Sequence, residues 1–133
     1  MNKISVLVLC VLFICGGLAL NPAQATTQHP EIWITPEVWD LGKVVEDKAF
    51  TKSIDIYNMG EALLEIEKTR TSCGCTTPKV SSNKILPYDY ATLEATFNSK
   101  SLKGKVERKI YVHTNDPNRS ITSVRILAEV LPK

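Results

Sequence analysis

The sequence has few of the residues that usually carry enzyme chemistry or bind metals. It contains 2 His and 4 Cys among 133 residues. No Ser-His-Asp set, glycine-rich phosphate loop or His-rich cluster stands out. No stretch of ten residues has the apolar stripe of an amphipathic helix, and no internal repeat is present. These absences predict that the protein is not an enzyme and that its fold is neither helical nor built from repeats.

The first 25 residues have the organisation of a secretory signal peptide. Lys3 supplies a single positive charge, and an almost unbroken apolar run extends over residues 4–20. Ala23-Gln24-Ala25 has the small-x-small form that signal peptidases cleave, so residues 1–25 are expected to be removed after Ala25. The mature protein is then predicted to be periplasmic or secreted. A retained membrane anchor is less favoured because no charged stop-transfer segment follows the apolar run.

Cleavage changes the meaning of the cysteine count. It removes Cys10 and Cys15 and leaves Cys73 and Cys75 as the only cysteines of the mature chain. Two cysteines exclude a framework of many disulfides. A lipoprotein is also less favoured, because Cys15 follows Phe13-Ile14 and a modified cysteine needs a small residue before it.

The mature chain is nearly neutral. Removal of Lys3 leaves 15 Lys and Arg against 14 Asp and Glu. This balance gives no indication of nucleic acid or of an acidic membrane surface as a partner. Its length of 108 residues, 26–133, suits one domain with its own core.

Apolar residues of the mature chain alternate with polar ones at every second position, which is typical of half-buried strands. The alternation predicts strands at residues 50–57, 64–67, 92–97, 110–112 and 124–130. Short strands at this spacing indicate an all-β sandwich or barrel.

Turn residues separate the predicted strands. Asn58-Met59-Gly60-Glu61 joins two strong candidates through residues that tolerate positive φ, which predicts a hairpin. Residues 102–105 and 115–118 also read as turns. We divide the mature chain into a polar lead-in, residues 26–35, and one β-sandwich domain, residues 36–131. Within the lead-in, residues 32–35 could form a short edge strand before Pro36.

Several motifs together resemble a known family, the bacterial domain-of-unknown-function family 1573. They are Trp39-Asp40-Leu41-Gly42, Asn58-Met59-Gly60, Thr71-Ser72-Cys73-Gly74-Cys75-Thr76, Ile85-Leu86-Pro87 and His113-Thr114-Asn115-Asp116-Pro117. The resemblance covers about residues 36–130. It implies an immunoglobulin-like antiparallel β-sandwich of about seven strands, related to Hydin-like and major-sperm-protein-like modules, and no established activity.

One departure from the family pattern concerns a turn. The family usually has Pro-Gly where this chain has Pro87-Tyr88. A type II turn favours glycine after the proline, so the sequence predicts a type I turn here instead.

Cys73 and Cys75 are the residues most suited to carry chemistry. In an oxidising compartment they could form a disulfide, since Cα atoms two residues apart can fall within bonding range, with Gly74 supplying backbone freedom. They could also pack separately as small apolar residues. Thiol-disulfide exchange is a third reading.

Metal binding is the remaining reading of the two cysteines. Zinc would need further ligands, for which His29 and His113 are the histidine candidates. Copper(I) prefers soft sulfur and could be held by Cys73 and Cys75, with Met59 as a weaker additional ligand. We expect no resident cofactor, because two thiols alone are a modest copper signal.

The other polar motifs have ordinary structural interpretations. Thr114-Asn115-Asp116-Pro117 is read as turn chemistry and not as a carboxylate site. Trp39 is expected to pack in the core or at an edge, whereas Trp33 could contact a partner.

Two functions therefore stay open. The first is an exported, non-enzymatic module that binds another protein or has a structural role in the periplasm or at the cell surface, for example by pairing an exposed strand edge. The alternative is a small thiol-redox or copper(I)-binding protein that uses Cys73 and Cys75. The fold alone does not choose between them.

Overall fold

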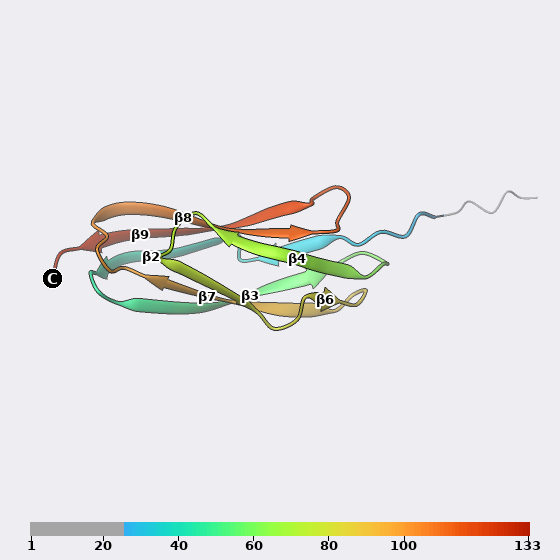
Figure 1. Cartoon of the computed structure of the whole chain (residues 1–133), viewed down its shortest axis with the longest axis horizontal. Coiled ribbons are helices and arrows are strands. Elements are labelled where there is room, and N and C mark those ends of the chain that lie inside the picture. The colour runs from blue at the N-terminus through green and yellow to red at the C-terminus, as the bar shows by residue number, and fades with distance from the viewer. Residues whose placement is uncertain (1–25) are drawn as a thin grey trace, which may run out of the picture.

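The structure, a computed structural model, describes residues 26–133, and these residues form two β-sheets packed face to face (Figure 1). The first, which we call the β3 sheet, has four strands in the order β1-β3-β7-β5. The second, the β8 sheet, has five in the order β2-β9-β8-β4-β6. The strands are β1 (Ile32–Thr35), β2 (Val38–Val45), β3 (Ala49–Asn58), β4 (Leu64–Thr71), β5 (Thr76–Val80), β6 (Lys84–Ile85), β7 (Tyr90–Asn98), β8 (Gly104–Thr114) and β9 (Ile121–Leu131).

The all-β immunoglobulin-like sandwich is confirmed, and each of the five predicted strands corresponds to an observed one. The predicted signal peptide, residues 1–25, lies outside the described residues, as do Cys10 and Cys15. In the described residues, no helix has the length and apolar composition that crossing a bilayer requires.

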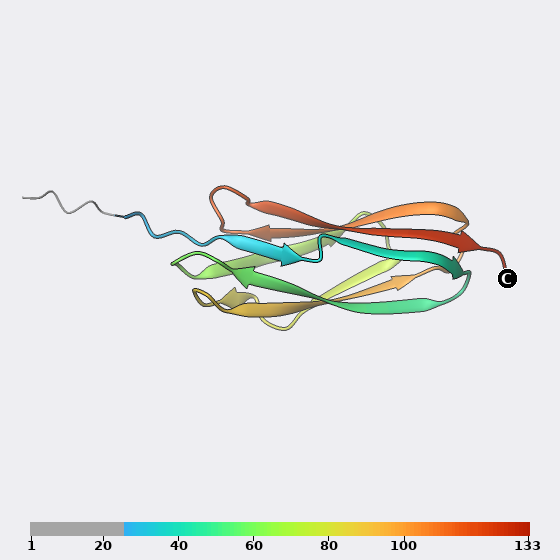
Figure 2. The ribbon, with the colours of Figure 1, turned by 180° about the vertical axis from the view of Figure 1, so that it is seen from behind.

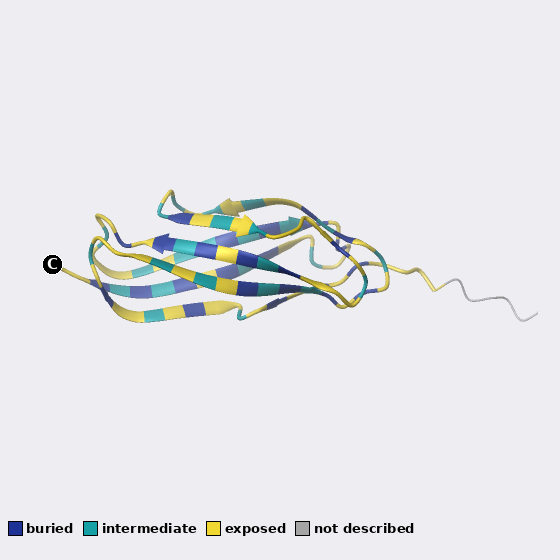
Figure 3. Cartoon of the chain, turned by 90° about the horizontal axis from the view of Figure 1, so that it is seen from below, coloured by how far each residue is buried: buried dark blue, intermediate teal, exposed yellow. Residues whose placement is uncertain are grey.

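The core lies between the sheets and is built from every second residue of their strands. Figure 3 shows buried and exposed positions alternating along the ribbons. The fully buried side chains include Phe97, Ile32, Ile34, Ile54, Ile56, Leu64, Ile85, Leu93, Ile110 and Ile126. Burying one such side chain contributes about 1.5–3 kcal/mol, so this alternation is the main reason that the sequence folds as a sandwich.

Three strands, β2, β5 and β6, were not predicted from the sequence. In β2 the pairing with β9 shifts between Asp40 and Lys43, and Gly42 between them has a φ of 65°. This bulge interrupts the two-residue period by which a strand is recognised. The β2–β9 pair is also parallel, whereas the other pairs are antiparallel as predicted.

The predicted hairpin at Asn58-Met59-Gly60-Glu61 is wrong, because β3 and β4 belong to different sheets. The buried Asn58 side chain fixes this crossing: its Nδ2 donates to the carbonyl oxygens of Ala62 and Ile85, at 2.7 Å and 3.0 Å. Its Oδ1 accepts from the Gly60 N–H at 3.0 Å. Gly60 has no positive φ; it is needed because a Cβ there would run into the backbone of residues 29–31.

The type I turn predicted at Pro87-Tyr88 is also wrong. The Asp89 N–H donates to the Leu86 carbonyl oxygen at 3.1 Å, which closes a four-residue turn. Tyr88 is its third residue and has a φ of 62°. A positive φ at that position defines a type II turn, so tyrosine occupies the conformation that glycine usually supplies.

Candidate functional site

Cys73 and Cys75 lie in the short loop between β4 and β5, where the chain crosses from the β8 sheet to the β3 sheet. The two residues form a disulfide with a Cα–Cα distance of 5.3 Å. Both are half-buried, and Cys75 packs against the hydrophobic core. One side of the bridge therefore faces solvent and the other faces the core.

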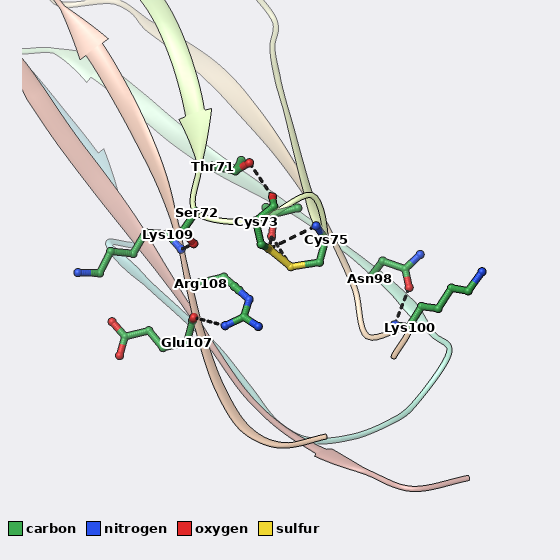
Figure 4. Close-up of a disulfide and its surroundings, with 10 residues drawn as sticks. Thr71, Ser72, Cys73, Cys75, Asn98, Lys100, Glu107, Arg108 and Lys109 are labelled. Carbon is green, nitrogen blue, oxygen red and sulfur yellow. Dashed lines mark hydrogen bonds between the residues drawn. A yellow bond between two sulfur atoms is a disulfide. The ribbon is translucent and has the colours of Figure 1, made fainter. Parts of the chain in front are cut away.

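Hydrogen bonds hold the disulfide loop from both sheets. The Thr71 hydroxyl donates to the Cys73 carbonyl oxygen at 2.8 Å, and the Asn98 N–H donates to the Cys75 carbonyl oxygen at 2.8 Å. Figure 4 draws Arg108 and Lys109 of β8 among the residues around the bridge. Arg108 Nε is buried and has no hydrogen-bond partner among the described residues.

Gly74 between the two cysteines does not have the role expected of it. Its φ lies outside the left-handed region, and an added Cβ would meet no atom within 4 Å. Any small residue could adopt this backbone, so the loop does not need the conformational freedom of glycine.

The weaker metal candidates are not brought to the cysteines. Met59 is 52% exposed in the turn before β4, and Cys73 follows the other end of β4. The eight extended residues of β4, which span about 26 Å, therefore separate the two side chains. His113 is half-buried on β8, opposite Lys68 of β4. Across residues 26–133, no group of three or more His, Cys, Asp and Glu side chains is placed to hold a metal ion.

The strand edges are the second candidate site, and several of them are protected. At the β1 edge, the buried Asp116 carboxylate accepts from the Ile32 N–H at 2.9 Å, and its other oxygen accepts from the Asn118 and Arg119 N–H groups at 2.8 Å and 3.1 Å. Burial of this carboxyl opposes ionisation, but the three N–H donors outweigh it and hold the pKa of Asp116 below its ordinary value. The turn predicted at residues 114–117 is thus confirmed, and it also caps the outward N–H of β1.

Three further edges carry features that hinder pairing with another chain. On β5, the Asn98 N–H donates to Cys75 and the Ser81 N–H to Thr92, so the alternate residue Pro78 faces outward and offers no N–H. On the other sheet, β6 has two residues and β2 is bulged. Short strands, outward prolines and bulges all discourage edge-to-edge association.

The first half of β3 is a stretch of edge that lacks this protection; the part of β4 after Ile66, which β6 does not pair, also has no strand on its outer side. Figure 2 shows β1 and β2 following each other along the β3 side of the molecule. β1 pairs with β3 only from Asp55 to Asn58, after which β2 continues on the β8 sheet. Residues 49–53 therefore have β7 on one side and no strand on the other.

The hydrogen-bond pattern shows which groups this edge offers. At the two ends of the β3–β7 ladder, Ser99 N–H donates to Lys48 and Asn58 N–H donates to the Asp89 carbonyl oxygen. Ladder bonds alternate between antiparallel strands, so even-numbered residues of β3 bond to β7. The N–H and C=O groups of Ala49, Thr51 and Ser53 then point outward. We call Ala49–Ser53 the free β3 edge.

The free β3 edge could not be found from the sequence, because alternation identifies a strand but not its neighbours. The role of Asp116 in capping β1 is equally long-range, joining residues 84 positions apart. Of the two tryptophans, Trp39 is 7% exposed and packs in the core, and Trp33 is 52% exposed on β1.

Comparison with solved structures defines the class of this fold. A protein of unknown function from Porphyromonas gingivalis W83 has a TM-score of 0.68 at 18% identity, with 83% of this chain and 51% of that chain covered. The PapD-like domain 7 of human CEP192 gives 0.58 at 7% identity, covering 79% and 88%. SSP-19, an MSP-domain protein like family member of Caenorhabditis elegans, gives 0.53 at 12% identity, covering 72% and 97%. The molecule is an immunoglobulin-like sandwich similar to PapD-like and MSP domains.

The family assignment is narrower than the class. Residues 32–130 match the model of a family described as protein of unknown function (DUF1573), and the chain belongs to that family. This confirms the resemblance seen in the motifs. The chain spans about half the length of the Porphyromonas gingivalis protein. No curated protein matches it in sequence.

Proposed function

We propose that this protein is an exported, non-enzymatic module that binds another protein by adding a strand of that partner to the free β3 edge. The observation that carries the proposal is the contrast between edges: β1 is capped by Asp116, β5 has Pro78, β6 is short and β2 is bulged. The first half of β3 is open by comparison, and an open edge is a ready template for β-augmentation.

The free edge offers enough backbone groups for a specific contact. The N–H and C=O groups of Ala49, Thr51 and Ser53 could each bond to a partner strand. One such hydrogen bond contributes about 0.5–1.5 kcal/mol net, so the complete set supports an affinity useful in a transient complex.

Lys52 gives the edge its selectivity. By the alternation of β3 its side chain points to the same side as the buried Ile54, and it is half-buried. An inward-pointing charge discourages indiscriminate pairing between sheets. A partner strand with an Asp or Glu opposite Lys52 would pair with that charge, so we expect an acidic residue in the bound segment.

The test uses edge variants as baits in the extracytoplasmic extract of the source cells. Thr51→Pro removes an outward N–H and leaves the backbone ladder between β3 and β7 in place, although it removes the hydrogen bond between the Thr51 and Thr96 hydroxyls. Lys52→Glu reverses the selective charge. Val38→Pro is the matched control, because Arg125 N–H donates to Glu37 and Val38 therefore faces outward on the β2 edge. Circular dichroism verifies that each bait is folded.

The proposal expects one partner to be retained by the wild type and by Val38→Pro, and lost from Thr51→Pro and Lys52→Glu. Replacing both Cys73 and Cys75 by serine should leave the partner bound. Retention of the partner by both β3 variants would refute binding at the free β3 edge. Loss of the partner from the double-serine variant would indicate that binding depends on the disulfide.

A second candidate, thiol-disulfide exchange at Cys73 and Cys75, is favoured by the partial exposure of the bridge. A partly exposed bridge can be reached by an attacking thiolate, which is the reactive form of a cysteine. Titrating the thiols of the native, metal-free protein against a reduced control tests this candidate. Exchange with a mild dithiol supports it, and a bridge that resists strong reductant in the folded state contradicts it. Stoichiometric uptake of copper(I) by the reduced protein would favour the copper reading.

A further inference from the structure

The two sulfurs of the bridge between Cys73 and Cys75 have different surroundings. The Cys73 Sγ accepts a hydrogen bond from the Cys75 N–H at 3.3 Å. The Cys75 side chain packs against the hydrophobic core. If the bridge opens, one sulfur therefore lies beside an N–H donor and the other beside apolar side chains.

A buried hydroxyl lies beside both sulfurs. Thr76, the first residue of β5, is 4% exposed. Its Oγ1 is 3.8 Å from Cys73 Sγ and 3.9 Å from Cys75 Sγ. A disulfide carries no proton, so the hydroxyl is the donor in both contacts. It is therefore placed to donate to a sulfur that becomes a thiolate.

A hollow of about 290 Å³ lies beside the bridge on the side of Cys75. Cys75, Asn98 and Lys100 are among its lining residues, whereas Cys73 is not. Figure 4 shows Asn98 and Lys100 on this side of the bridge. Gly74 also lines the hollow and has no side chain to narrow it. Ligand pockets usually measure about 300–1,000 Å³, so the hollow suits a small molecule.

We propose that a low-molecular-weight thiol enters this hollow and attacks Cys75 Sγ, so that Cys73 leaves as a thiolate. The inference deepens the second candidate function, thiol-disulfide exchange, and rests on it. The incoming thiol first loses its proton to solvent. Its sulfur then bonds to Cys75 Sγ while the S–S bond breaks, and the electron pair of that bond stays on Cys73 Sγ. The products are a mixed disulfide at Cys75 and a Cys73 thiolate, which restores the bridge by the reverse reaction.

The direction of attack follows from the thiolate that leaves. In thiol-disulfide exchange, a better-stabilised thiolate departs faster. Cys73 would leave as a thiolate held by the Cys75 N–H and the Thr76 hydroxyl. Cys75 would leave as a thiolate packed against the core, and apolar surroundings disfavour its charge. Access has the same preference, because Cys75 lines the hollow.

Mass spectrometry of the opened bridge tests the direction. The folded, oxidised protein is mixed with 2-mercaptoethanol or glutathione and quenched in acid, and its free thiol is capped with N-ethylmaleimide. Trypsin cleaves after Arg70 and Lys79 and releases residues 71–79. Fragmentation of this peptide should show the small thiol on Cys75 and the maleimide on Cys73. The small thiol on Cys73, or equally on both cysteines, overturns the proposal.

A second measurement does not depend on the lifetime of the mixed disulfide. Cys75→Ser and Cys73→Ser each retain one of the two thiols, and alkylation by iodoacetamide is followed in the same peptide as the pH is raised. The midpoint should lie about one pH unit lower in Cys75→Ser, because one hydrogen bond to a charged group has about this effect. Equal midpoints, or a lower midpoint in Cys73→Ser, overturn the proposal.

Thr76 is assigned as a positioning residue for the Cys73 thiolate. Thr76→Val keeps the shape of the side chain and removes the hydroxyl. Combined with Cys75→Ser, it should raise the alkylation midpoint of Cys73 by about one pH unit. Thr76→Ser is the matched control, because it keeps the hydroxyl, and it should leave the midpoint unchanged. An unchanged midpoint in Thr76→Val would overturn this role of the hydroxyl.

These outcomes separate the direction of attack from the exchange reaction itself. A bridge that resists both the small thiols and dithiothreitol in the folded protein contradicts thiol-disulfide exchange and this proposal together. A bridge that opens and carries the small thiol on Cys73 contradicts only the direction of attack, and exchange at the bridge would stand.

Discussion

Replacing Gly60 by alanine tests the way in which the N-terminal segment is joined to the sandwich. An added Cβ would overlap the His29 carbonyl oxygen and would lie 2.6 Å from the Glu31 nitrogen. These are backbone atoms, which a rotamer change cannot move. The substitution must therefore displace residues 29–31 from the β3–β4 crossing.

The cost follows from the hydrogen bonds that this displacement breaks. Met59 N–H donates to Glu31 at 2.8 Å, Glu61 N–H donates to His29 at 3.1 Å, and Glu31 N–H donates to the Asn58 side chain at 3.3 Å. At about 0.5–1.5 kcal/mol for each bond, we expect Gly60→Ala to lower the free energy of unfolding by about 3 kcal/mol.

Urea denaturation followed by circular dichroism measures this loss, and the melting temperature should fall by about 15 °C in a domain of this size. Gly74→Ala is the matched control, because a Cβ there meets nothing within 4 Å. Its stability should stay within about 0.5 kcal/mol of the wild type. A Gly60→Ala protein as stable as the Gly74→Ala protein would refute the steric reasoning.

Other substitutions test the turns and the bridge. Tyr88→Gly should stabilise the protein by about 0.5–1 kcal/mol in thermal unfolding, because it relieves a side chain at positive φ, whereas Tyr88→Ala should not. Asp116→Asn should lower stability by about 1–3 kcal/mol at neutral pH. The pKa of Asp116 in the folded protein lies below its ordinary value, so its contribution to stability is present above about pH 4 and is lost as the pH falls through the folded pKa. The stabilities of the wild type and Asp116→Asn should therefore converge in acid. A difference in stability that does not change with pH would contradict this. The Cys73→Ser, Cys75→Ser double variant should lose less than about 2 kcal/mol in urea, because the bridge closes almost no chain; a larger loss would show that the bridge is a main support of the fold.

The sequence predicted the parts of the fold that depend on local alternation. Ile54 and Ile56 in β3, or Val124 and Ile126 in β9, bury one face of a strand at every second residue, and this pattern is visible without neighbours. β2 was missed because its bulge at residues 40–43 breaks that period. The predicted hairpin failed because turn composition does not say which sheet the next strand joins.

The candidate site also has one part that the sequence predicted and another part that it did not. The Cys73 and Cys75 pair is a local feature and could be singled out from the sequence. The free β3 edge depends on where β1 leaves β3 after residue 35. Such pairings are set by packing of the whole sandwich, so no local pattern reveals them.

The most direct test of the central claim, that a partner strand joins the free β3 edge, is amide hydrogen exchange by NMR on the free and the partner-bound protein. In the free protein, the outward amides of Thr51 and Ser53 should exchange quickly and the amide of Lys52, bonded to β7, slowly. On binding, the amides of Thr51 and Ser53 should become protected. Slow exchange of these amides before binding, or unchanged exchange after it, would contradict the account.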